Sequence, residues 1–254
     1  MSSDGLDKRM RVFETAHDHS ILPSLYTVVR LDGRNFSKLT SDLQVDKPMD
    51  EGFRDHMLST TLRLMDCGVH AVFGYTQSDE ISILLHPDCN SFGRKLRKLN
   101  SVLAGEASAH MSLKLGQPAV FDCRISQLPT EALVVDYFRW RIGDAIRNGL
   151  NVHAYWLLRD EGLTATETTE RLRGLKTSEL QDLLYAHGLN FNDLPAWKKQ
   201  GTGATWITYE KRGVNPITGD SVTSTRRRLT PNFSLPVRDE LFQYIRDLVP
   251  ARSL

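Results

Sequence analysis

The chain is poor in cysteine and has no long apolar run. Its three cysteines, Cys67, Cys89 and Cys123, are an odd number without CxxC spacing. That pattern argues against a disulfide framework or a zinc site and indicates reduced thiols. No apolar stretch reaches the length of a membrane span, and the N-terminus lacks the pattern of a secretory signal. Together these absences predict a soluble, cytoplasmic protein without a membrane partner.

Neither sign of charge dominates, and several familiar catalytic motifs are missing. The 32 Lys and Arg residues and the 31 Asp and Glu residues leave a net charge of +1. Any contact with nucleic acid must therefore come from local basic clusters. The sequence has no Walker loop, GxSxG or HExxH pattern, which removes three common classes of enzyme from consideration. With 254 residues the chain can bury a substantial core in one large domain or two small ones.

The most informative stretch is a predicted hairpin with carboxylates at its tip. Strand-like runs over 69–73 and 81–85 flank the polar residues 77–80. Neighbouring residues of a strand point to opposite faces. We therefore expect one of Asp79 and Glu80 to face a site and the other to support it.

A further carboxylate follows another predicted strand. The run 25–31 leads into Asp32 and Gly33, and the glycine allows a ligand to approach the backbone closely. A strand end and a hairpin tip can bring carboxylates together around hard cations such as Mg²⁺. Taken alone, either motif is equally consistent with an ordinary turn and a solvated carboxylate. Taken together, they favour a metal site that contains Asp32 and Asp79.

The order of the predicted elements indicates the fold class. After the strand over 25–31 we expect a helix that begins at Asp46 or Asp50 and is closed by Gly68. The carboxylate hairpin follows it. The next elements are a helix from Asn90 or Ser91 to Leu115 and a strand over 119–125. This is the βαββαβ order of a ferredoxin-type sheet, which polymerase palm domains also have. We predict an α+β protein with a palm-like catalytic domain over 1–130.

The remainder, 131–254, is predicted to be a helical region with a basic hairpin. We expect a helix that begins at Glu131 and breaks at Gly149, followed by helices over 165–172 and 178–186. Two strands, over 204–209 and 222–229, and a terminal helix over 239–249 complete the region. The loop 211–221, which contains Asn215 and Thr218, connects the two strands, and Pro231 and Pro236 frame an irregular segment. We predict that this region packs on the palm domain as one unit, with the hairpin as an arm.

Local basic clusters are candidate contacts for phosphates of a nucleic acid. Arg94, Lys95, Arg97 and Lys98 crowd the predicted start of a helix without an acidic partner one turn away. Because positive charge at a helix N-terminus opposes the macrodipole, phosphate binding is favoured over a merely solvated surface. Further candidate cations are Lys176, Lys198, Lys199, Arg226, Arg227 and Arg228.

Several motifs resemble those of the tRNA(His) guanylyltransferase family and its 3′–5′ polymerase relatives. The motifs are Asp32-Gly33-Arg34-Asn35-Phe36, Lys47-Pro48, Gln77-Ser78-Asp79-Glu80, Asp136-Tyr137-Phe138-Arg139-Trp140-Arg141, and Gly201-Thr202 before the strand of Trp206. The likeness spans residues 8–207. It implies a polymerase-like palm with a helical remainder, two Mg²⁺ ions, and nucleotidyl transfer to the 5′ end of tRNA. It also implies a homo-oligomer, a tetramer.

The resemblance assigns roles to individual residues. It implies that Asp32 and Asp79 bind the metal ions with help from the Gly33 carbonyl. Glu80 is implied to be catalytic beside them, and Lys47 to contact nucleotide phosphates. The implied nucleotide site comprises Gly33, Arg34, Asn35, Phe36, Lys47, Ser78 and Asp79. In the implied reaction ATP, or alternatively GTP, first activates the 5′-monophosphate of tRNA. The 3′-hydroxyl of an incoming nucleoside triphosphate then attacks the activated end.

One segment departs from the family pattern. Family members that add guanosine to tRNA(His) carry His-Ile-Asn-Asn where this chain has Ile146-Arg147-Asn148-Gly149. Only Asn148, a predicted tRNA contact, is retained. We therefore predict a template-dependent polymerase that repairs the 5′ end of truncated tRNA, with tRNA(His) guanylylation as the alternative. A tRNA-binding protein with a vestigial site and a palm-type nucleotide cyclase are competing hypotheses.

Overall fold

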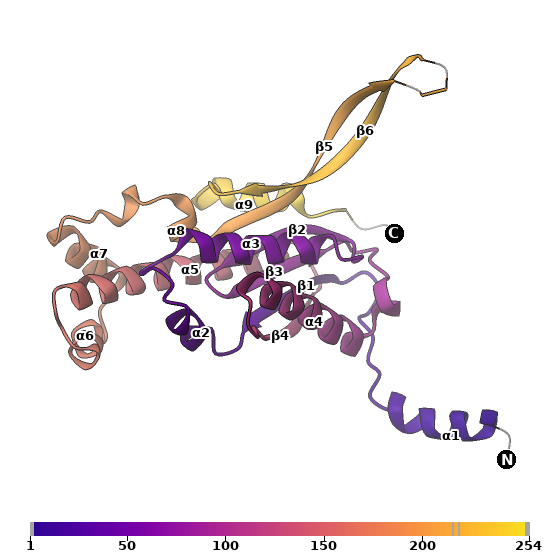
Figure 1. Ribbon diagram of the computed structural model, residues 1–254, viewed down its shortest axis with the longest axis horizontal. Coiled ribbons are helices and arrows are strands. Elements are labelled where there is room, and N and C mark those ends of the chain that lie inside the picture. Colours follow the sequence, from indigo (N-terminus) through magenta and orange to yellow (C-terminus); the bar gives the residue numbers. More distant parts are fainter. Residues whose placement is uncertain (1–2, 215, 218, 252–254) are drawn as a thin grey trace.

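The computed structural model describes residues 3–214, 216–217 and 219–251 and is built around one antiparallel sheet (Figure 1). The strand order is β4-β1-β3-β2-β5-β6. The strands are β1 (Tyr26–Gly33), β2 (Ala71–Gln77), β3 (Glu80–Leu85), β4 (Phe121–Leu128), β5 (Thr202–Val214) and β6 (Ser221–Asn232). Every neighbouring pair is antiparallel.

Helices cover both faces of this sheet. The helices are α1 (Ser3–Thr15), α2 (Phe36–Asp42), α3 (Glu51–Met65), α4 (Leu96–Leu115), α5 (Glu131–Asp160), α6 (Ala165–Leu172), α7 (Thr177–Ala186), α8 (Ala196–Gln200) and α9 (Arg238–Leu248). Short 3₁₀ turns cover Ser91–Arg94 and Phe191–Asp193. In the part of the chain that is described, no helix combines the length and apolar character needed to cross a membrane.

The alternation of β1 divides the core into two layers. Val29 and Leu31 pack in a cluster with residues of α3 and α4, whereas Val28 packs on the other face with residues of α5 and α9. All three of these side chains are fully buried. The order β1, α2 and α3, β2, β3, α4, β4 confirms the predicted βαββαβ palm-like sheet. The division at residue 130 stays a prediction.

The strands are longer than the sequence predicted. β1 continues through Asp32 and Gly33, which pair with Glu80 and Phe121, so these residues belong to the sheet and not to a turn. β6 includes Pro231, in the segment that was expected to be irregular.

The hairpin of β5 and β6 is anchored in the sheet. The base of β5 pairs with β2, from Thr76↔Thr202 to Phe73↔Thr205, and the outer part projects as an arm (Figure 1). Asn215 and Thr218 of the predicted loop lie outside the described residues.

Two predicted helix boundaries were wrong. α4 begins at Leu96 instead of at residues 90–91, because Phe92, Gly93 and Arg94 have φ angles of 56°, 60° and 60°, which no α-helix accommodates. α5 runs without interruption through Gly149.

Gly149 permits a close approach and does not break its helix. A Cβ added there would lie 3.2 Å from the Phe191 ring and 3.3 Å from the Lys198 carbonyl oxygen. The glycine therefore lets the segment before β5 pack directly on the α5 backbone.

We predict that alanine stabilises the protein at one glycine of α5 and not at another. Gly143→Ala should raise the free energy of unfolding by about 0.5–1 kcal/mol, because alanine favours helix and nothing lies within 4 Å of the new methyl group. Gly149→Ala should gain nothing or be destabilising, because its methyl group meets the Phe191 ring. Urea unfolding of both variants measures the difference, and an equal gain at the two positions would contradict the packing role of Gly149.

Candidate active site

The end of β1 and the tip of the β2–β3 hairpin are joined by the sheet itself. Ser78 adopts a φ of 52° and turns the chain between the two strands. The Gly33 N–H donates to the Asp79 carbonyl oxygen at 3.0 Å. Asp32 pairs with Glu80 across the β1–β3 ladder. The structure thus brings the three predicted carboxylates together.

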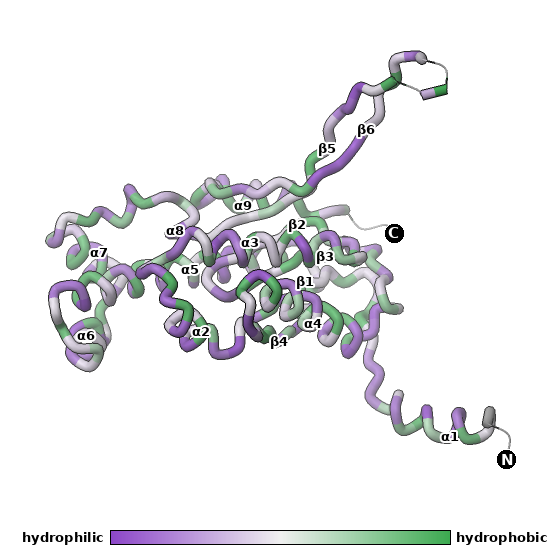
Figure 2. Tube along the Cα trace, in the orientation of Figure 1, coloured by the Kyte–Doolittle hydropathy of each residue, from purple (hydrophilic) through white to green (hydrophobic). Residues whose placement is uncertain are grey.

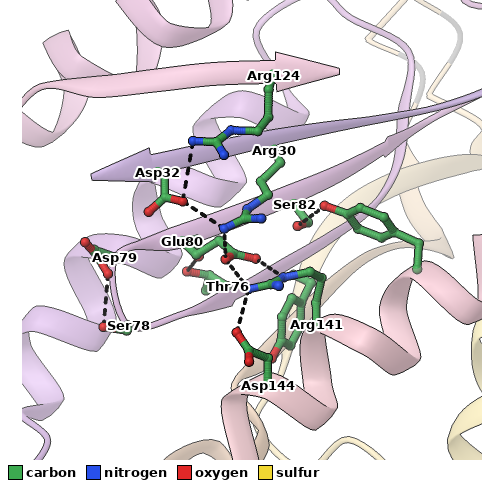
Figure 3. Close-up of polar contacts among 12 residues, drawn as sticks. Arg30, Asp32, Thr76, Ser78, Asp79, Glu80, Ser82, Arg124, Arg141 and Asp144 are labelled. Atoms are coloured by element: carbon green, nitrogen blue, oxygen red, sulfur yellow. Dashed lines mark hydrogen bonds and ion pairs between the residues drawn. The ribbon is translucent and has the colours of Figure 1, made fainter. Parts of the chain in front are cut away.

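Glu80 is buried beneath this tip and fully paired (Figure 3). Its exposed fraction is 8%. Its two carboxylate oxygens accept hydrogen bonds from Nε and Nη2 of Arg141 at 2.6 and 2.5 Å. Nη2 of Arg30 lies 2.9 Å from Oε2 of Glu80 and 2.9 Å from Oδ2 of Asp32. Glu80 is therefore held beneath the tip by two arginines, and the separate roles predicted for Asp79 and Glu80 stay predictions.

Helix α5 supplies the groups that hold the hairpin from below. Tyr137, Arg141 and Asp144 are spaced i, i+4 and i+7, which places them on one side of the helix. The Tyr137 hydroxyl lies 3.0 Å from Oγ of Ser82, and Arg141 donates to Oδ2 of Asp144 at 3.1 Å. These contacts fix the orientation of the Arg141 guanidinium toward Glu80.

Asp79 carries an electrostatic signature of a cation site. Burial raises the pKa of its carboxyl above the ordinary value, and the nearby charges of Asp32 and Glu80 raise it further. Ser78 donates to Oδ1 of Asp79 at 3.2 Å. Among the described residues no group of three or more His, Cys, Asp or Glu side chains is placed to hold a metal ion. Two carboxylates nonetheless suit Mg²⁺, which proteins bind through one or two carboxylates together with waters and substrate phosphates.

A pocket of about 670 Å³ opens beside these carboxylates. Of the predicted site residues it is lined by Asp32, Phe36, Lys47, Ser78, Asp79, Glu80 and Asn148. Its wall also contains the aromatic rings of Trp156 and Trp197. Nζ of Lys47 lies 6.0 Å from the centre of the Trp156 ring. Cations, apolar rings and carboxylates on one wall suit a nucleoside triphosphate, whose base is flat and whose phosphates are anionic.

Three residues predicted for the nucleotide site do not line the pocket. Arg34 and Asn35 are exposed, and Gly33 lies behind Phe36. A Cβ added at Gly33 would come within 2.5 Å of the Phe36 ring. The glycine thus allows this ring to pack against the strand, and a nucleotide contact of these three residues stays a prediction.

The basic cluster before α4 is used differently from the prediction. Arg94 donates to the carbonyl oxygens of Ile21, Leu22, Pro87 and Cys89, at 2.8 to 3.1 Å. It therefore ties two loops together and is not a free cation for RNA.

Lys95 and Arg97 have an acidic partner that is distant in sequence. Both pair with Asp18, and these hydrogen bonds lower the pKa of its carboxyl to about 2. The acidic partner that is missing one turn away in the sequence comes from the segment after α1, and a contact of Lys95 and Arg97 with RNA stays a prediction. Lys98 is exposed, and its contact with RNA stays a prediction.

Comparison with known proteins identifies the family. A family model described as tRNAHis guanylyltransferase matches residues 7–129, and one described as Thg1 C terminal domain matches residues 132–234. A probable tRNA(His) guanylyltransferase of Drosophila melanogaster is 33% identical over 195 residues, which are 73% of this chain and 68% of the relative. The chain belongs to the tRNA(His) guanylyltransferase family. The match extends through the β5–β6 hairpin, which the sequence analysis had placed outside the region of resemblance.

Solved structures of this family share the fold. A bacterial tRNA(His) guanylyltransferase (Thg1)-like protein in complex with ATP has a TM-score of 0.74 at 27% identity, covering 96% of this chain and 99% of that one. The tRNA(His) guanylyltransferase from Saccharomyces cerevisiae has a TM-score of 0.69 at 27% identity, covering 76% of this chain and 91% of that one. The palm-like fold and membership in a family of nucleotidyltransferases are thereby confirmed.

Sequence reasoning missed the cations that hold Glu80. Arg30 lies two residues before Asp32 and so points to the same face of β1, a signal that strand alternation contained. Arg141 ends the motif 136–141, but no local signal indicates its partner, because Glu80 is 61 residues away and meets it only in the folded protein. The same applies to Trp156 and Trp197.

We predict that Arg141→Met destabilises this family member by about 3 kcal/mol, because buried Glu80 would keep only Arg30 as a charged partner. Urea unfolding provides the measurement. Arg147→Met is the matched control on the same helix: Arg147 pairs with Asp144 at 2.6 Å but is 58% exposed, so its loss should cost less than about 1 kcal/mol. An equal loss of unfolding free energy in the two variants would show that the buried Arg141–Glu80 pair stabilises the protein no more than the exposed Arg147–Asp144 pair.

Proposed function

We propose that this protein is a metal-dependent 3′–5′ nucleotidyltransferase that extends the 5′ end of tRNA. The observation that carries the proposal is the shared position of Asp32, Asp79 and Lys47 on one pocket. The names of its relatives favour addition of guanosine to tRNA(His) as the reaction. A homo-oligomeric state and a cytoplasmic location remain predictions from the sequence.

The proposed chemistry has two steps. In the first, an oxygen of the tRNA 5′-phosphate attacks the α-phosphorus of ATP, and pyrophosphate leaves. In the second, the 3′-hydroxyl of the incoming nucleoside triphosphate loses its proton and attacks the tRNA 5′-phosphorus, and AMP leaves. Phosphoryl transfer of this kind depends mainly on positioning and on neutralising charge.

The residues of the pocket divide these tasks. Asp32 and Asp79 would hold Mg²⁺, and the ion would supply neutralisation of charge on the phosphate oxygens. Lys47 adds a positive charge to the lining of the same pocket. Glu80 keeps Arg30 and Arg141 in place and through Arg30 also fixes the orientation of Asp32.

Templated repair of truncated tRNA is a second candidate reaction. It is favoured by Ile146-Arg147-Asn148-Gly149, which lacks most of the segment associated with guanosine addition. Asn148 lines the pocket, so this segment is at the place where it would influence the choice of substrate.

A 5′-extension assay tests the proposed function. Purified protein with Mg²⁺, ATP and all four nucleoside triphosphates should extend tRNA(His) that lacks its extra guanosine, 5′-truncated tRNA, or both. Asp79→Asn should reduce the rate by at least about 100-fold, since a group that stabilises transition-state charge is removed. Asp122→Asn, at a 59% exposed carboxylate on β4, is the control and should stay within a few-fold of wild type. Full activity of Asp79→Asn would refute the proposed role of the site.

The arm provides a second proposed contact with tRNA, on one face of the hairpin. The β5–β6 register pairs Tyr209 with Arg226 and Lys211 with Ser224, so Tyr209, Lys211, Arg226 and Arg228 share a face. We call this set the arm face. It contains three cations and no carboxylate, and the outer part of β6 is hydrophilic (Figure 2).

The third predicted arginine points the other way. Arg227 lies with Arg212 on the opposite face, and its guanidinium is 4.3 Å from the centre of the Trp206 ring. Arg227 therefore does not belong to the arm face, and its contact with tRNA stays a prediction. The arm face lies at positions 207–211 of β5, five to nine residues from Thr202 at the pocket. At about 3.3 Å per residue this is about 17–30 Å, which places the arm face against a region of tRNA away from its 5′ end.

Two double variants with the same loss of charge separate the faces. Arg226→Ala with Arg228→Ala should weaken tRNA binding and reduce the slope of log K against log salt by about 1–2, because phosphate contacts are lost. Arg212→Ala with Arg227→Ala should change the slope by less than half as much. The measurement is tRNA affinity as a function of salt concentration. Equal slopes for the two double variants would exclude a specific role of the arm face.

A further inference from the structure

Trp140 is an exposed aromatic ring beside the catalytic candidates. Its side chain is 53% exposed, although tryptophan, a large apolar residue, is usually well buried. The Arg141 guanidinium lies 4.4 Å and the Arg30 guanidinium 5.9 Å from the centre of its ring. The Tyr137 ring packs against it edge-on at 6.0 Å. These three neighbours hold the ring in a fixed orientation and leave a large part of its surface open to solvent.

Trp140 lies outside the nucleotide pocket, although it is a neighbour of two arginines that line it. Both Arg30 and Arg141 line the pocket, but Trp140 does not. The pocket extends along the sheet toward Thr76 and Thr202, on β2 and β5. β4 is on the other side of β1, and this strand, which is described in full, contributes no lining residue.

An exposed arginine continues this surface onto β4. Arg124 is the cross-strand partner of Arg30, so both side chains project from the face of the sheet that α5 covers. The Arg124 side chain is 55% exposed, lies 2.9 Å from Asp122 and 3.9 Å from Asp32, and is labelled with Arg30 and Asp32 in Figure 3. Trp140 and Arg124 are both neighbours of Arg30, and we call these two residues the β4-side surface: an open ring, and a cation that lies 3.9 Å from Asp32.

This combination suits an unpaired nucleotide of RNA. Aromatic rings bind single-stranded bases by stacking, irrespective of sequence, and arginines bind the adjoining phosphates. In tRNA the 5′ nucleotide lies at the end of the acceptor stem, and the opposite strand continues from this end as an unpaired 3′ strand. An enzyme that holds the 5′-phosphate at Asp32 and Asp79 therefore has the unpaired 3′ strand close by. The nucleotide pocket lies on one side of the carboxylates, and the β4-side surface lies on the other side.

We propose that Trp140 stacks on a base of the unpaired 3′ strand of the tRNA substrate and that Arg124 contacts a phosphate next to it. This inference rests on the proposed function, which takes tRNA as the substrate and places its 5′-phosphate at Asp32 and Asp79. The β4-side surface positions the acceptor end so that the 5′-phosphate lies at the carboxylates. It acts on the RNA and not on the incoming nucleoside triphosphate.

Binding measurements with two forms of tRNA test the proposal. Wild-type protein should bind intact tRNA about tenfold more tightly than tRNA whose unpaired 3′ strand has been removed, as expected for one stacked base. Trp140→Ala should lose this preference and bind both forms with the affinity that wild type has for the trimmed form. Trp140→Phe, which keeps a ring, should retain part of the preference. Tyr185→Ala, at a 73% exposed aromatic on α7, is the matched control and should behave as wild type.

A fluorescent base reports the contact directly. 2-Aminopurine in the unpaired 3′ strand should be quenched by wild-type protein and by Tyr185→Ala but not by Trp140→Ala. The KM for the nucleoside triphosphate should be the same in all variants, whereas stacking on the incoming nucleotide would raise it in Trp140→Ala. Thermal unfolding checks that Trp140→Ala is folded. If it is not, Trp140→Phe, which keeps a ring, serves as the second variant.

The outcomes separate this inference from the proposed function. If Trp140→Ala keeps the preference for intact tRNA, or loses affinity equally for both forms, the stacking proposal is overturned. If wild-type protein extends no tRNA but shows the preference and the quenching, the proposed function fails while the stacking contact stands.

Discussion

A buried glutamate held by two arginines fixes the geometry of the candidate active site. Glu80 accepts two hydrogen bonds from Arg141, and Arg30 bridges it to Asp32. A buried carboxylate without such partners would cost several kcal/mol. The hairpin tip therefore keeps its position only while α5 lies across the sheet, and the carboxylate that faces the pocket, Asp79, depends on a helix far along the chain.

The antiparallel sheet links this site to two separate surfaces. β5 begins at Thr202, beside the pocket, and the same strand runs out to the arm. β1 carries Arg30 between the pocket and Arg124 of β4. Because each residue of a strand advances it by about 3.3 Å and its side chains alternate between the faces, each surface lies at a defined distance along the sheet from the carboxylates. A long RNA helix and its unpaired end can thus be held by surfaces that belong to one rigid sheet.

The predicted features that hold in the structure depend on local patterns. The βαββαβ order follows from apolar periodicity and turn residues, and the Asp50 cap of α3 follows from helix-start chemistry. The failures occurred where a distant segment decides. Gly149 was expected to break a helix, but the packed segment around Phe191 needs a residue without a side chain there.

Periodicity and turn chemistry act over a few residues, so the order of the elements and the carboxylates at the ends of strands can be read from the sequence. Which charges remain available follows only from the folded chain. The fold pairs both Lys95 and Arg97 with the one carboxylate of Asp18, uses Arg94 for loop carbonyls, and turns Arg227 away from Arg226 and Arg228. Charges interact through space, so the partner of a side chain is set by the fold and not by its neighbours in the sequence.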